Sequence, residues 1–201
     1  MNIQHAFQEA INNNDTVNFK FLLSNHKKDL DFSYLNNHAI RLVSSCGYLD
    51  IFKVLIKDNK VDPTLCTQFC IRGAFKYSHY EIAKQLLKFK KVDPTILNNI
   101  CINYSVYNNN IKMVELLLNE RQISEKEGYI KALTNSYVLN NNKKMFELLF
   151  KNLNKSIKYD ISELFDFAMK NQDFYLINKI FSCKMVNTSN VSNKFKCTIS
   201  L

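Results

Sequence analysis

Two closely related stretches, KVDPTLCTQF (Lys60–Phe69) and KVDPTILNNI (Lys91–Ile100), hold both prolines of the 201-residue chain. Proline fixes the backbone φ angle and donates no backbone hydrogen bond, so a helix does not run through it. Aspartate accepts hydrogen bonds from backbone amides in turns. The repeated Val-Asp-Pro-Thr therefore indicates a linker between successive copies of one structural unit. DLDF (Asp29–Phe32) and RQIS (Arg121–Ser124) are interpreted as degenerate copies of it.

Apolar triplets recur along the chain at nearly constant intervals. Their members are spaced i, i+3, i+4, which places them on one face of a helix. They are Phe19/Leu22/Leu23, Phe52/Leu55/Ile56, Ala83/Leu86/Leu87, Val114/Leu117/Leu118, Phe146/Leu149/Phe150 and Ile177/Ile180/Phe181. This rhythm, with a period of roughly 30 residues, predicts six copies of a helix-containing unit.

A second set of triplets with the same spacing precedes the first set by about a dozen residues. They are Phe7/Ala10/Ile11, Ile40/Val43/Ser44, Ile71/Ala74/Phe75, Ile102/Ser105/Val106, Leu133/Ser136/Tyr137 and Phe165/Ala168/Met169. The middle member is always small, as expected where two antiparallel helices approach closely. Each unit is therefore predicted to be a helical hairpin.

The segments between the two helices of each unit are rich in asparagine, as in NNN (Asn108–Asn110) and NNN (Asn140–Asn142), or contain glycine, as in CGY (Cys46–Tyr48). Helices commonly end at a residue in the left-handed conformation, for which glycine is best and asparagine next. These segments are interpreted as turns, although asparagine runs also occur in disordered segments.

Helices of about eight to ten residues are too short to be stable alone in water. The hairpins must therefore stack, and the chain is predicted to be all-α, with stability arising at the contacts between neighbouring units. We expect the repeat array to span residues 1–182. The tail, residues 183–201, either caps the last unit or is disordered.

The segments NNHAIRLVSSCGYLDIFKVLIKDNKVDP (Asn36–Pro63) and SHYEIAKQLLKFKKVDP (Ser78–Pro94) resemble ankyrin repeats, in the shortened, asparagine-rich form frequent in amoebae and giant DNA viruses. The resemblance covers about residues 1–182. It departs from the family where the usual Thr-Pro-Leu-His is replaced by HAIR (His38–Arg41), FCIR (Phe69–Arg72) and ICIN (Ile100–Asn103). It implies an ankyrin-type solenoid of about six stacked helical hairpins, a non-catalytic module that binds a protein partner through the concave face of its first helices.

The candidate partner-binding residues lie on the first helices of units two to four. They are Arg41, Ser45, Arg72, Lys76, Tyr77, Tyr104 and Tyr107. Tyrosine and arginine are the residue types that most often dominate the energetics of protein interfaces. We expect a basic, tyrosine-lined groove for an acidic or mixed-charge protein segment. The alternative is that these are ordinary surface residues.

The net charge of +9 makes nucleic-acid binding through surface lysines the competing function. Only three of the 27 basic residues are arginine, however, and arginine is the residue that reads base edges and clamps phosphates. A lysine- and asparagine-rich composition also arises from AT-rich codons. We therefore expect a protein partner rather than nucleic acid, and a chain without a partner is the third alternative.

No catalytic motif such as HExxH, GxSxG or a P-loop occurs, so we expect no enzyme activity, cofactor or metal. His79 is interpreted as a turn residue, and Cys66 and Cys70 lack the spacing of a zinc site. Glu115 and Glu147 are expected on solvated helix faces. No apolar run is long enough to span a membrane or to form a signal peptide. We expect a cytoplasmic monomer, with a nuclear or host-cell location left open.

Overall fold

A computed structural model describes residues 2–120, 127–153 and 160–182 of the chain, and in those ranges every element is helical. The prediction of an all-α protein is therefore confirmed. The elements are α1 (Ile3–Asn12), α2 (Thr16–His26), the 3₁₀ turn η1 (Lys27–Asp29), α3 (Tyr34–Cys46), α4 (Leu49–Leu55), α5 (Leu65–Lys76), α6 (Tyr80–Leu87), α7 (Ile96–Tyr107), α8 (Ile111–Glu120), α9 (Glu127–Val138), α10 (Lys143–Lys151), α11 (Ser162–Lys170) and α12 (Phe174–Ser182). None of these helices is both long and apolar enough to cross a membrane.

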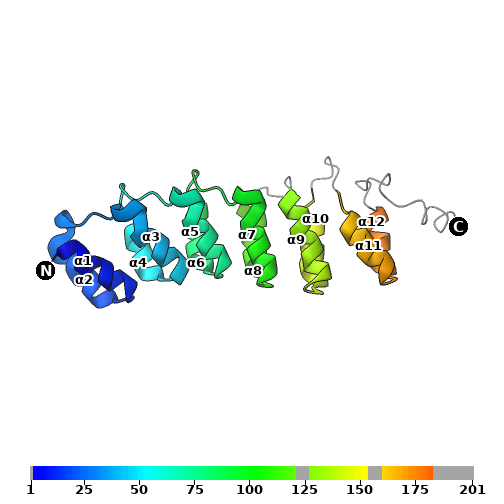
Figure 1. The fold of residues 1–201 in the computed structure, drawn as a ribbon, viewed down its shortest axis with the longest axis horizontal. Coiled ribbons are helices and arrows are strands. Elements are labelled where there is room, and N and C mark those ends of the chain that lie inside the picture. Colours follow the sequence, from blue (N-terminus) through cyan, green and yellow to red (C-terminus); the bar gives the residue numbers. More distant parts are fainter. Residues whose placement is uncertain (1, 121–126, 154–159, 183–201) are drawn as a thin grey trace.

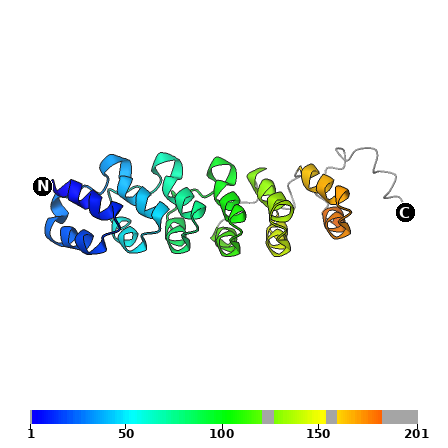
Figure 2. The same cartoon turned by 60° about the horizontal axis from the view of Figure 1, so that its bottom comes forward.

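Consecutive helices pack in pairs, from α1 with α2 to α11 with α12, and the pairs stand side by side in one row (Figure 1). Helices α3, α5, α7 and α9 contact one another in sequence, and α2, α4, α6 and α8 do the same behind them. The row therefore has two layers, with the first helix of each pair in one layer and the second helix in the other (Figure 2).

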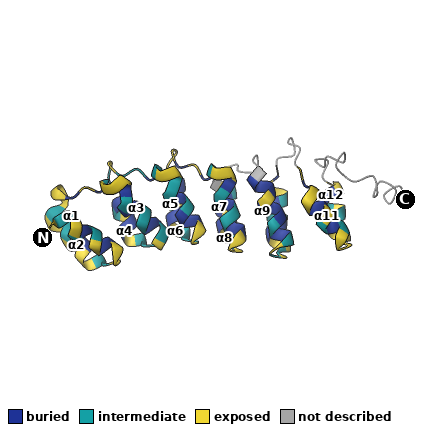
Figure 3. Cartoon of the chain, viewed as in Figure 1, coloured by how far each residue is buried: buried dark blue, intermediate teal, exposed yellow. Residues whose placement is uncertain are grey.

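The core runs continuously through the middle of the row, between the two layers (Figure 3). The first-helix triplets predicted from the sequence are buried throughout except for Met169, which is half-buried. The second-helix triplets are buried or half-buried up to the last unit, where Phe181 is 37% exposed. The spacing of apolar residues thus identified the buried face of every helix.

Every hairpin turn contains one residue in the left-handed conformation, as expected. These residues are Asn14, Gly47, Ser78, Asn109, Asn141 and Gln172. Just beyond each of them, a backbone N–H bonds back to the carbonyl of the small residue in the middle of the first-helix triplet, at 2.7 to 3.0 Å. The acceptors are Ala10, Val43, Ala74, Ser105, Ser136 and Ala168. Such bonds complete the last turn of each first helix.

The residue that donates this bond also starts the second helix. In four units its side chain accepts a hydrogen bond from the N–H three residues on, at 2.9 to 3.2 Å, and so caps the helix. These caps are Asp15, Asn110, Asn142 and Asp173. Units two and three have Tyr48 and His79 there, and neither side chain caps its own helix.

His79 instead connects unit three to unit two. Its Nε2 lies 2.8 Å from the carbonyl oxygen of Ser45, and since a carbonyl can only accept, Nε2 carries the proton. The ring would lie only 2.6 Å from a Cβ placed on Gly47, and Gly47 also has a φ of +79°. Asn108 and Asn140 make equivalent bonds to the carbonyls of the unit before, at 2.8 and 2.6 Å. The turns of units three, four and five thus tie these units to the preceding ones.

The linkers share an Asp-x-Ser/Thr turn. The Oδ1 of Asp62 accepts hydrogen bonds from the Thr64 N–H at 2.8 Å and from its hydroxyl at 2.6 Å, and Asp93 and Asp31 hold their turns in the same way. Asp160 accepts from the Ser162 N–H at 3.0 Å, a further copy that the sequence analysis missed. The expected copy at Arg121–Ser124 and the tail at 183–201 lie outside the described residues.

The first helices reach forward to these linkers. The Gln4 side chain makes two bonds to the backbone of Asp31, at 2.9 and 3.0 Å. At the equivalent positions, Asn37 accepts from the Asp62 N–H at 2.8 Å and Gln68 donates to the Lys91 carbonyl at 3.1 Å. Each linker is therefore held both by its own aspartate and by the helix before it.

Glu115 is exposed as expected, and the Glu147 side chain is 38% exposed but is also held by two residues of the last unit. The Nζ of Lys179 lies 2.6 Å from Glu147 Oε2, and the Tyr175 hydroxyl donates to the other carboxylate oxygen. Lys179 and Tyr175 belong to α12 and Glu147 to α10, so this carboxylate joins the last two units. This ion pair depends on the positive charge of Lys179, which belongs to the following unit.

Replacing Leu86 by aspartate tests the contribution of the core. Leu86 is fully buried, so Leu86→Asp puts an unpaired carboxylate among apolar side chains and should cost at least about 3 kcal/mol of unfolding free energy. Lys84→Asp on the same helix is exposed and should change stability by less than about 1 kcal/mol. Urea unfolding followed by far-UV circular dichroism measures both, and equal stabilities would contradict the assigned burial.

Acid should destabilise the linkers. Hydrogen bonds from Ser33, Thr64 and Ser162 hold the pKa values of Asp31, Asp62 and Asp160 below the ordinary range. A depressed pKa in the folded state gives stabilisation that is complete above the unfolded pKa of about 3.9 and is lost as the pH falls through the folded value.

We therefore expect a constant contribution between about pH 5 and 7 and a falling urea midpoint below about pH 4. The variant Asp31→Asn with Asp62→Asn should be less stable at pH 7 and should lose less on acidification. A variant whose acid profile matches that of the parent chain would show that these carboxylates do not contribute.

Candidate functional site

Three of the first helices begin with a single left-handed turn. The residues involved are Leu35–Asn37 in α3, Cys66–Gln68 in α5 and Leu97–Asn99 in α7, with φ between 48° and 61°. Right-handed helix starts at the next residue in each case, as the sequence predicts. L-residues in this conformation cost about 1–2 kcal/mol each, so other interactions must hold the turns in place.

Two of the predicted binding residues hold these turns. Arg41 donates from Nε to the Asn36 carbonyl and from Nη2 to the Leu35 carbonyl, both at 3.1 Å. Arg72 makes the equivalent bonds to Thr67 at 2.7 Å and Cys66 at 3.2 Å. In α7, Asn103 takes over this position and donates to the Asn99 carbonyl at 3.0 Å. Each guanidinium is thereby fixed in direction.

Phe69 lies between the two arginines. Its ring centroid is 5.6 Å from Cζ of Arg41 and 5.7 Å from Cζ of Arg72, within the range of cation–π attraction. We call these three residues the arginine–phenylalanine stack. The sequence analysis missed Phe69, although its position three residues before Arg72 places both side chains on the same side of the helix.

Lys76, Tyr77 and Tyr107 lie at the opposite ends of the same helices, next to the hairpin turns. Tyr77 is 52% exposed and Tyr107 is 81% exposed, and the Nζ of Lys76 lies 5.1 Å from the centroid of the Tyr77 ring. Lys76 and Tyr107 occupy the same position in successive units. Tyr104 is half-buried and packs against the core with part of its surface. These residues form an open, basic and aromatic surface.

Ser45 is placed differently. Its hydroxyl bonds to the Arg41 carbonyl at 3.1 Å and lies 2.5 Å from where a Cβ on Gly73 would stand. Ser45 therefore lies in the close contact between α3 and α5, where the missing side chain of Gly73 makes room for it. Its part in partner binding stays a prediction, and the same holds for the other six residues.

The cysteines of the first helices belong to the core. Cys70 and Cys101 are fully buried at the positions that Ala39 and Ala132 occupy in other units. Desolvation raises the pKa of the Cys70 thiol to about 12 and raises that of Cys101 as well. Both thiols are therefore neutral at physiological pH, and a neutral buried thiol is a poor nucleophile.

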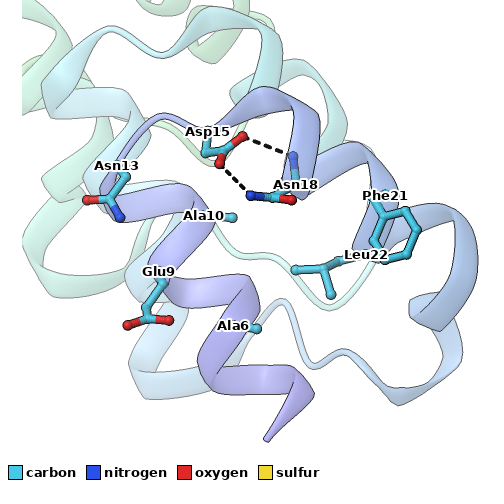
Figure 4. A pocket seen from close by; sticks show the side chains of 8 residues that line it. All are labelled: Ala6, Glu9, Ala10, Asn13, Asp15, Asn18, Phe21 and Leu22. Carbon is cyan, nitrogen blue, oxygen red and sulfur yellow. Dashed lines mark hydrogen bonds between the residues drawn. The ribbon is translucent and has the colours of Figure 1, made fainter. Parts of the chain in front are cut away.

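A separate pocket of about 320 Å³ lies between α1 and α2 in the first unit (Figure 4). Ala6, Ala10 and Leu22 line it, and Phe21, which is 60% exposed, stands at its edge. In the second unit the counterparts of the first three are buried, among them Leu55, which matches Leu22. None of the seven predicted residues lines this pocket.

Arg72→Lys tests whether the guanidinium holds the left-handed turn. Lysine keeps the charge but cannot reproduce the two-pronged bonds to Cys66 and Thr67, so we expect a loss of about 1–3 kcal/mol of unfolding free energy. Lys76→Ala, an exposed change on the same helix, should change stability by less than about 0.5 kcal/mol. Chemical denaturation compares the two variants. An Arg72→Lys variant with the same unfolding free energy as the parent chain would refute the assigned role of Arg72.

No protein-family model, curated protein or solved structure matches the chain. The basis for inferring a function is thus the chemistry of the surface itself: two fixed guanidinium groups, a phenylalanine ring between them, and exposed lysine and tyrosine side chains along neighbouring helices.

Proposed function

We propose that the chain is an ankyrin-type solenoid that acts as a non-catalytic protein-interaction module, and that it binds its partner through the outer face of α3, α5 and α7. The observation that carries this proposal is the arginine–phenylalanine stack on α3 and α5. Exposed Lys76 and Tyr77 lie at the end of α5, and exposed Tyr107 ends the neighbouring α7. A partner with an acidic or mixed-charge segment fits this surface best.

The ankyrin assignment is supported by the repeat length of roughly 30 residues and by the pairing of two helices per unit. Stacked helix pairs that contact only their neighbours produce a long continuous surface, which is what such arrays use for binding. The left-handed turns at Leu35–Asn37 and its two counterparts end directly before the segments that replace the family's Thr-Pro-Leu-His. They are a further departure from the family pattern.

Pre-organisation makes the arginine pair a strong candidate for a binding hot spot. A free arginine side chain loses rotamer entropy when it pairs with a partner, and Arg41 and Arg72 have lost most of this freedom already through their backbone bonds. Their planar guanidinium groups, already fixed in direction, can donate hydrogen bonds to a carboxylate with little further loss of entropy. Tyr77 and Tyr107 add apolar area with a hydroxyl at the tip, as in many interface centres.

The double variant Tyr104→Ala with Tyr107→Ala tests this face. Affinity capture from the native cell, with mass spectrometry, identifies the partner, and titration then compares the variants. We expect the double variant to weaken binding at least about tenfold, since tyrosines at interface centres contribute about 1–2 kcal/mol each. The control Val17→Ala with Phe21→Ala removes two exposed apolar side chains from α2 and should leave the affinity unchanged.

If the tyrosine double variant captures the partner as well as the parent chain does, this face is not the binding surface. The competing function, nucleic-acid binding, has one observation in its favour: among pairs in which both residues are described, Lys179 with Glu147 is the one that brings a lysine within 4.0 Å of a carboxylate. Affinity for DNA or RNA that persists above physiological salt, with a steep dependence on salt concentration, would favour that function instead.

A further inference from the structure

A second pocket, of about 510 Å³, lies between the loops that follow α4 and α6. We call it the loop pocket. One wall comes from the loop of unit two, with Lys57, Val61 and Pro63, and the other from the loop of unit three, with Phe89, Lys90 and Lys91. None of the seven residues predicted to bind a partner lines it, so it is distinct from the face of the first helices.

The rim of the loop pocket is basic. Lys57, Lys90 and Lys91 are exposed, and none of them has a carboxylate within 4.0 Å among the described residues. The segments 56–64 and 88–91, which form the two loops, carry five lysines and two aspartates. The loops thus carry an excess of positive charge.

The two aspartates are already engaged. Asp58 Oδ1 accepts a hydrogen bond from the Lys60 N–H at 3.0 Å. Hydrogen bonds from Thr64 and the nearby positive charge of Lys91 hold the pKa of Asp62 below its ordinary range. These carboxylates shape the loops, and they would repel any anionic group placed close to them, so the anionic groups of a ligand must lie at the lysines.

Part of the lining of the loop pocket is apolar, beside its lysines, aspartates and other polar residues. Of the apolar residues, Val61 is half-buried, Pro63 is buried, and the Phe89 ring is 38% exposed. Apolar surface next to flexible point charges suits a ligand that combines a large apolar side chain with carboxylates. Single-stranded nucleic acid would instead need open aromatic faces for stacking, ideally beside arginine.

We propose that the loop pocket binds an acidic peptide segment, with one large apolar side chain between the two loops and its carboxylates against Lys57, Lys90 and Lys91. This surface is additional to the first-helix face. A partner long enough to cross both would be held at two places, and its overall affinity would exceed that of either contact alone.

Fluorescence anisotropy with a labelled peptide, Glu-Glu-Asp-Phe-Glu-Glu, tests the proposal on the full chain. We expect measurable binding below about 1 mM, and a loss of at least about tenfold in the variant Lys57→Gln, Lys90→Gln and Lys91→Gln. The control variant Lys20→Gln, Lys53→Gln and Lys84→Gln removes the same charge from exposed positions on the second helices. It should weaken binding by less than about threefold.

A second peptide, with alanine in place of phenylalanine, tests the apolar part and should bind at least about fivefold more weakly. Equal losses in the two triple variants, equal affinity of the two peptides, or no binding at about 1 mM would each overturn the proposal. Tighter binding of an oligouridine RNA than of the peptide would also overturn it in favour of nucleic acid. If the triple variant unfolds, Lys90→Gln and Lys91→Gln tested singly must each weaken binding.

Discussion

The contact between neighbouring helix pairs is the interaction on which the rest of the structure depends. The described α-helices range in length from the 7 residues of α4 to the 13 residues of α3, and helices this short do not persist alone in water. Each pair becomes stable because its apolar faces are covered both within the pair and by a neighbouring pair in the row. The nearly constant repeat length is therefore a requirement of packing, since the apolar face of every helix pair must lie directly beside that of the neighbouring pair.

Polar groups set the register of this packing. Asn108 and Asn140 hold the turns of units four and five to the unit before, while Asn37 and Gln68 hold the starts of α3 and α5 to the linkers that follow. Apolar contacts alone would let one helix pair slide along its neighbour at little cost. Hydrogen bonds to backbone groups fix the position, because a shifted pair would leave those groups unpaired and partly buried.

The sequence predicted the features that follow from periodicity. The spacing of apolar residues identified the helix pairs, and asparagine and Gly47 identified turns that need a left-handed residue. The left-handed turn at Cys66–Gln68 could not be predicted, because these residue types do not favour that conformation. It depends on a guanidinium four residues beyond the turn and on the contact between units.

The same limit applied to the candidate site. Residue type and phase placed Tyr77, Tyr107 and Lys76 on an exposed surface. They could not show that Arg41 and Arg72 bind the backbone of their own units, that Ser45 lies against Gly73, or that Phe69 completes a stack. They also could not show that Glu147 pairs with Lys179, which lies one unit away. Contacts between units depend on three-dimensional neighbours that a single repeat does not contain.

The helix content of one isolated unit tests the dependence on neighbours most directly. A peptide of residues 65–95 contains α5, α6 and the linker after them, and far-UV circular dichroism can compare it with the full chain at room temperature. The account predicts that the peptide is largely unstructured, with helix content rising only when adjacent units are added. A peptide as helical as the same segment in the full chain, and unfolding cooperatively on its own, would contradict it.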